Sequence, residues 1–105
     1  MNLLRLTPLL ALIACQSHRP AFEPACAELR HAIIQQRPVY EMQDTGRLLV
    51  AHYGPTIAWE AARQVWVELA GDEPLDNACD VRFMAYQTRY TKSVGWLICY
   101  KDYWL

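Results

Sequence analysis

The sequence predicts an α+β fold, in which two helices pack on a small antiparallel four-stranded sheet made of two hairpins. Two observations lead to this prediction. Apolar residues recur every three or four positions in 24–36 and 57–71, which is typical of amphipathic helices. The stretches 39–53 and 80–104 are rich in strand-forming residues, and a short polar segment divides each of them. The predicted order is therefore α-β-β-α-β-β.

The first helix is expected from Pro24 to Gln36. Cys26, Leu29 and Ile33 form an apolar stripe at helical spacing, and Pro38 ends the pattern. A hairpin should follow, with strands at Val39–Gln43 and Arg47–Tyr53 around the turn sequence Asp44-Thr45-Gly46.

The second helix is expected between the break at Gly54-Pro55 and Gly71, because apolar residues recur there at intervals of three and four. The polar segment Asp72–Asn77 should be a surface loop. A second hairpin is expected from Asp80–Tyr90 and Val94–Trp104, on either side of Thr91-Lys92-Ser93. Both of its faces are partly apolar, so a second layer or a partner should cover the face that the helices leave open.

The N-terminus has the pattern of an export signal. One basic residue, Arg5, precedes an apolar stretch that is too short to span a bilayer. The stretch ends in Leu12-Ile13-Ala14-Cys15, which resembles the lipobox of bacterial lipoproteins. The resemblance implies cleavage before Cys15, a diacylglycerol on its sulfur and an acyl chain such as palmitate on the new amino terminus. Several acyl chains anchor a protein stably.

This resemblance divides the chain into a signal peptide (1–14), a lipidated tether (15–24) and a single domain (25–105). An Asp after the lipidated cysteine commonly retains such proteins in the inner membrane, and this chain has Gln16. The resemblance therefore favours the outer membrane, with the domain in the periplasm. No other part of the chain resembles a known family.

Composition limits the function classes. The formal net charge is −1, and loss of Arg5 with the signal makes it more negative, so the chain lacks the basic surface that nucleic-acid binding requires. His18, His31 and His52 have no paired spacing with one another or with the cysteines, which argues against a metal site. No cofactor is expected beyond the lipid on Cys15.

The cysteines are candidates for a disulfide in an oxidising compartment. If lipid occupies Cys15, then Cys26, Cys79 and Cys99 remain for one bridge. The predicted hairpin register separates Cys79 from Cys99 by about 20 Å, which favours Cys26–Cys79. A different turn position would restore Cys79–Cys99, and three reduced thiols are the other alternative. Cys26 could also act as a nucleophile with His31 or His52 as base, although no cysteine-peptidase signature surrounds it.

Aromatic residues gather towards the C-terminus and either complete the core or form a binding surface. The candidate partner-binding patch comprises Tyr86, Trp96, Tyr100, Tyr103 and Trp104. We expect a lipid-anchored envelope protein that binds a protein partner, as an accessory subunit, an inhibitor, or an immunity or exclusion factor, and that is not an enzyme. The alternatives are a periplasmic thiol enzyme using Cys26 and a purely structural lipoprotein.

Overall fold

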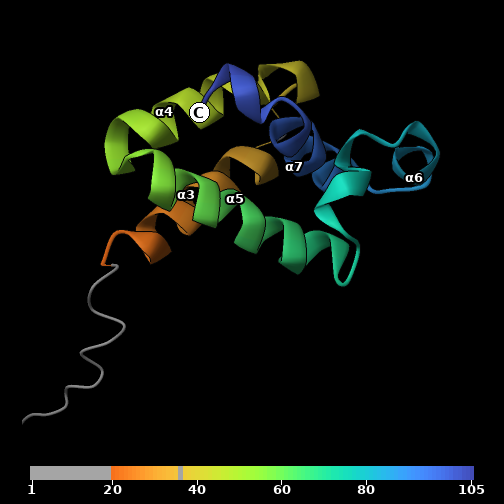
Figure 1. Ribbon diagram of the computed structural model, residues 1–105, viewed down its shortest axis with the longest axis horizontal. Helices are drawn as coiled ribbons and strands as arrows, with labels where there is room; N and C mark the ends of the chain where they lie inside the picture. Colours follow the sequence, from red (N-terminus) through yellow and green to blue (C-terminus); the bar gives the residue numbers. More distant parts are fainter. Residues whose placement is uncertain (1–19, 36) are drawn as a thin grey trace, which may run out of the picture.

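The computed structural model describes residues 20–35 and 37–105, and in this part of the chain it contains helices and no β-strand (Figure 1). The predicted α+β fold with a four-stranded sheet is therefore wrong, because the described chain is all-α. The α-helices are α3 (Phe22–Ile34), α4 (Met42–Tyr53), α5 (Pro55–Ala70), α6 (Val81–Ala85) and α7 (Arg89–Cys99). Three 3-10 helices connect or follow them: η1 (Val39–Glu41), η2 (Leu75–Cys79) and η3 (Lys101–Tyr103).

The two helices expected from the sequence are confirmed. The first, α3, begins and ends two residues earlier than expected, so the last three residues of the predicted tether are helical. The second, α5, begins at Pro55, whose fixed φ suits the first turn of a helix. Gly54 and Gly71 flank α5 with φ of 88° and 66°, which side chains other than glycine rarely adopt. The segment after Gly71, expected as a loop, runs into η2.

The first predicted hairpin is instead η1 and α4. The polar turn expected at Asp44-Thr45-Gly46 lies inside α4, where Gly46 is buried. An ideal Cβ at Gly46 would lie 2.5 Å from Trp104 Cδ2 and 2.8 Å from Leu97 Cδ1. Glycine is therefore needed for close packing within a helix, and a short-range turn signal does not distinguish this role from a hairpin.

The second predicted hairpin is instead α6 and α7. Asp80 accepts hydrogen bonds from the backbone N–H groups of Arg82 and Phe83, and Thr88 accepts one from Thr91. These are N-cap interactions, which satisfy amide groups at the start of a helix. Tertiary packing then outweighs the strand preference of the β-branched and aromatic residues, because α7 buries one stripe: Thr91, Val94, Leu97 and Ile98.

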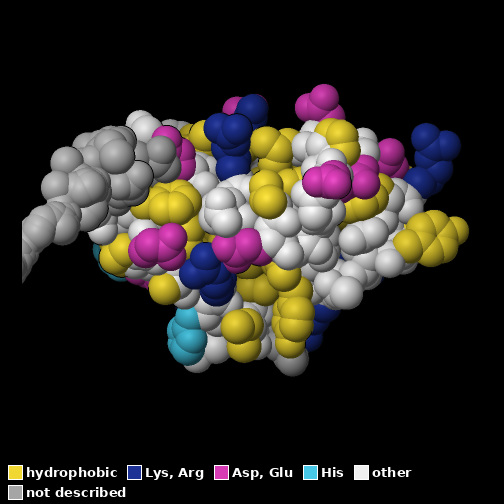
Figure 2. Space-filling model, turned by 90° about the horizontal axis from the view of Figure 1, so that it is seen from below, with side chains coloured by type: hydrophobic (Ala, Val, Ile, Leu, Met, Phe, Trp, Pro, Cys, Tyr) yellow, Lys and Arg dark blue, Asp and Glu magenta, His cyan; other side chains and the backbone are white. Residues whose placement is uncertain are grey.

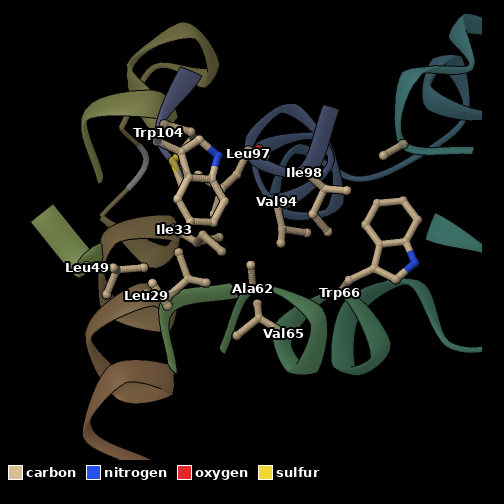
Figure 3. Packing of buried hydrophobic residues seen from close by; sticks show 13 residues of the cluster. Leu29, Ile33, Leu49, Ala62, Val65, Trp66, Val94, Leu97, Ile98 and Trp104 are labelled. Carbon is tan, nitrogen blue, oxygen red and sulfur yellow. Dashed lines mark hydrogen bonds between the residues drawn. The ribbon is translucent and has the colours of Figure 1, made fainter. Parts of the chain in front are cut away.

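The core lies around α5, which packs against α3, α4 and α7. Figure 3 shows Trp104 and Trp66 on opposite sides of Val94 and Ile98 within the buried cluster. Both indole N–H groups are satisfied: Trp66 Nε1 donates to the Glu73 carbonyl at 2.7 Å and Trp104 Nε1 to the Leu97 carbonyl at 2.8 Å.

The predicted Cys26–Cys79 pairing is also wrong, because the disulfide joins Cys79 to Cys99, with Cα atoms 5.3 Å apart. The prediction measured the separation along extended strands, which rise about 3.3 Å per residue, whereas a helix rises about 1.5 Å. With α6 and α7 helical, the chain between the two cysteines folds back on itself. Cys26 lies fully buried in α3, outside this bridge.

Candidate functional site

Of the five residues of the predicted aromatic patch, one lies in the core and the other four are wholly or partly at the surface. Trp104 is 5% exposed and belongs to the core, whereas Tyr86 follows α6 and is 89% exposed. Trp96, Tyr100 and Tyr103 form a row, with ring centroids 4.6 Å apart for the first pair and 5.8 Å for the second. The side chains that remain available at the surface therefore lie along α6, α7 and η3.

Next to this row is an apolar groove with a volume of about 340 Å³, open to solvent. Four elements supply its walls: η1, η2, α6 and α7. The residues that line the groove are Val39, Ala78, Cys79, Val81, Met84, Lys92, Trp96, Cys99 and Tyr100. Of the expected patch, Trp96 and Tyr100 belong to this lining.

The α7 wall follows from helical spacing. Lys92, Trp96 and Cys99 are four and three residues apart, so they share one face of the helix. The opposite face carries the buried stripe that includes Val94 and Leu97. A helical reading of 89–99 would have placed Lys92 beside Trp96 from the sequence. Val39 and Val81 reach the groove only through tertiary folding, and no local signal indicates them.

The disulfide joins two of the elements that line the groove, η2 and α7. Cys79 is the last residue of η2 and Cys99 the last of α7, and both line the hollow. Val81, which begins α6 and also lines the groove, is 79% exposed. Figure 2 shows that apolar side chains reach the surface in several places between charged ones, so exposure alone does not indicate a site. The groove lies at one such place, where the exposed Val81 borders a hollow with an apolar lining.

The residues proposed for thiol chemistry occupy another part of the molecule. Cys26 is fully buried in an apolar cluster with Ala25 and Ala61, where no substrate reaches it without movement of α3 or α5. His52 is half-exposed, with Nδ1 3.2 Å from Glu28 Oε2.

Glu28 also accepts a hydrogen bond from the Tyr53 hydroxyl at 2.9 Å. This hydrogen bond to a carboxylate, together with burial, raises the pKa of Tyr53. Glu28 thus connects α3 to the end of α4, as a polar contact between helices.

A second polar contact joins α3 to α5. Arg30 donates from Nε and a terminal nitrogen to the two carboxylate oxygens of Glu68, at 2.8 and 2.6 Å, and Gln64 donates to the same carboxylate. The hydrogen bonds from Arg30 lower the pKa of Glu68 and raise that of Arg30. A bidentate pair of this kind fixes the orientation of the two helices relative to each other.

No three His, Cys, Asp or Glu side chains within 20–35 and 37–105 are placed to hold a metal ion together. None of the helices formed by these residues has the length and apolarity to cross a bilayer. His18 and Cys15, the predicted lipidation site, lie outside the described residues. Comparison of the chain with protein-family models, curated proteins and solved structures gave no match.

Proposed function

We propose that this chain is a lipid-anchored protein of the bacterial envelope that acts by binding a protein partner in the periplasm through the groove. The observation that carries the proposal is the apolar lining of the groove, which includes the exposed Val81, together with the exposed Tyr86 two residues after the lining residue Met84. Apolar surface left in water favours association by about 25 cal/mol per Å² buried. Apolar pockets bordered by aromatic side chains are also where binding energy concentrates in protein interfaces.

The anchor half of the proposal rests on the resemblance of Leu12-Ile13-Ala14-Cys15 to a lipobox, and Gln16 favours the outer membrane. Anchoring confines the protein to a surface, which raises its effective concentration near partners in the same membrane. An accessory subunit, an inhibitor and an immunity or exclusion factor would all use such an arrangement.

The anchor is tested by the intact mass of the protein purified from membranes. We expect loss of residues 1–14 and the added mass of a diacylglycerol and an acyl chain on Cys15. A protein that retains Met1 and carries no lipid would contradict the anchored reading.

Partner binding is tested by photo-crosslinking in cells with p-benzoylphenylalanine in place of Tyr86. We expect a defined protein adduct that Val81→Glu abolishes, because a carboxylate at the groove wall would be desolvated on contact. The matched control is Val67→Glu, since Val67 is 56% exposed on α5 and does not line the groove. Absence of an adduct, or equal adducts in the two variants, would contradict binding at the groove.

A further inference from the structure

Among the described residues that line the groove, Lys92 is the one that carries a charge. It lies one helical turn before Trp96 on α7 and is partly buried. The other lining residues are apolar or aromatic, so the low polarity of the wall reduces the screening of the ammonium charge by water.

The Lys92 ammonium has no acidic partner among the residues that the structure describes. The described ion pairs involve other basic groups: Arg30, Arg47, His52 and Arg82. Lys101, also near the C-terminus, lies over the Trp59 ring, with Nζ 5.5 Å from its centroid. Lys92 is thus a cation beside an apolar hollow with its charge unmatched, which complements an apolar ligand that carries an anion.

The size and openness of the groove indicate the kind of ligand. Its volume of about 340 Å³ is at the lower end for small-molecule sites, which enclose most of the ligand surface. A fatty acyl chain laid in an open hollow would leave much of its surface in water. One or two side chains of a peptide fit better, because the rest of the peptide stays solvated and the anchor alone is buried.

We propose that the groove takes a peptide segment of the partner in which an apolar anchor side chain lies next to Asp or Glu, and that this carboxylate pairs with Lys92. The inference rests on the proposed function and adds the chemistry that the partner must carry. The apolar side chain supplies burial between Met84 and Trp96. The carboxylate supplies selectivity, since a neutral segment would leave the Lys92 charge without a partner.

The test uses the purified full-length lipoprotein in detergent micelles, with tryptophan fluorescence as the signal and protein-free micelles as the blank. The probes are acetyl-Asp-Leu-Phe-amide and acetyl-Asn-Leu-Phe-amide, which differ only in the carboxylate. We expect the Asp peptide to bind about fivefold more tightly, the size of effect that a partly exposed ion pair supplies. Lys92→Met, which keeps the apolar stem, should remove this difference, and Lys92→Arg should keep it.

The matched control is Lys101→Met, which removes a charge of the same kind outside the groove lining and should keep the Asp preference. Equal binding of the two peptides by the unaltered protein, or a preference that survives Lys92→Met, would overturn the proposal. So would tighter Lys92-dependent binding of dodecanoate or of acetyl-Asn-Leu-Phe with a free C-terminal carboxylate, because the anion would then come from another source. The Tyr86 crosslinking result is independent: an adduct with no Asp preference leaves the groove as a contact but removes the acidic motif.

Discussion

Trp104 and Trp96 lie in two regions of the molecule that differ, the buried core and the groove. Trp104 is buried, its indole N–H donates to the Leu97 carbonyl, and Gly46 leaves room for its ring. Trp96 is only partly buried, and its buried Nε1 has no hydrogen-bond partner in the part of the chain that the structure describes. One tryptophan closes the core and the other lines a surface hollow. The aromatic residues of 86–104 therefore lie partly in the core and partly at the surface, where we propose that they contact a partner.

The largest expected effect is that of removing the buried ring. Trp104→Ala should lower the free energy of unfolding by about 3–5 kcal/mol, because it leaves a cavity and an unpaired Leu97 carbonyl. Trp96→Ala should cost clearly less, since its ring is partly solvated and its N–H makes no hydrogen bond that is lost. Urea denaturation measures the free energy of unfolding of both variants. Equal losses of stability would contradict the distinction between the core and the groove.

Removing the disulfide should have the next largest effect on stability. Both of its cysteines line the groove. Cys79→Ser with Cys99→Ser should lower stability by about 3 kcal/mol through the greater freedom of the unfolded chain. The groove elements η2 and α7 would also lose their covalent link, so the Tyr86 adduct should weaken. Denaturation with and without reductant provides the measurement, and a variant as stable as the oxidised protein would contradict the pairing.

Alanine substitutions at two helical glycines should have smaller effects on stability, and these effects should differ between the core and the groove. Gly46→Ala should destabilise by about 1–3 kcal/mol, because its Cβ meets the Trp104 ring and overpacks the core. At Gly95 the nearest atom is the terminal methyl of Met84, at 2.7 Å, which can move into the groove, while the Trp66 ring lies at 3.3 Å and needs to shift by only a few tenths of an ångström. Gly95→Ala should therefore change stability by less than about 1 kcal/mol, since the gain in helix propensity offsets the shift. Thermal unfolding of both variants measures the two losses of stability. A larger loss for Gly95→Ala than for Gly46→Ala would contradict this prediction.

The smallest effect is expected at the Arg30–Glu68 pair, which belongs neither to the buried core nor to the groove. The pair is about one-third exposed, so Glu68→Gln should cost less than about 1 kcal/mol at neutral pH. The pKa of Glu68 is lowered in the folded protein, so its contribution is present above the unfolded carboxyl pKa and is lost as pH falls through the folded value. Urea denaturation at neutral and at acidic pH should show the variant and the parent converging in acid. A difference that persists there would contradict this assignment.

The sequence predicted helices where a periodic apolar stripe stands between clear breaks, as in α3 and α5. The sequence-based prediction was wrong where one local pattern is compatible with two structures. Asp44-Thr45-Gly46 reads as a turn, but Gly46 serves helix packing. Likewise, β-branched and aromatic residues in 89–99 read as a strand, because strand preference reflects packing surroundings that the sequence does not display. The wrong register then excluded the Cys79–Cys99 bridge.

What the sequence determined by itself was local: the two periodic helices, the lipobox resemblance at Cys15, the low net charge and the collection of C-terminal aromatic residues. The tertiary structure alone decided which aromatic residue is buried, which cysteines pair, and that Lys92 and Trp96 line one hollow together with Val39 and Val81. The physical reason is that these outcomes depend on contacts between residues far apart in the chain. Helix periodicity and a signal motif depend on neighbours within a few residues.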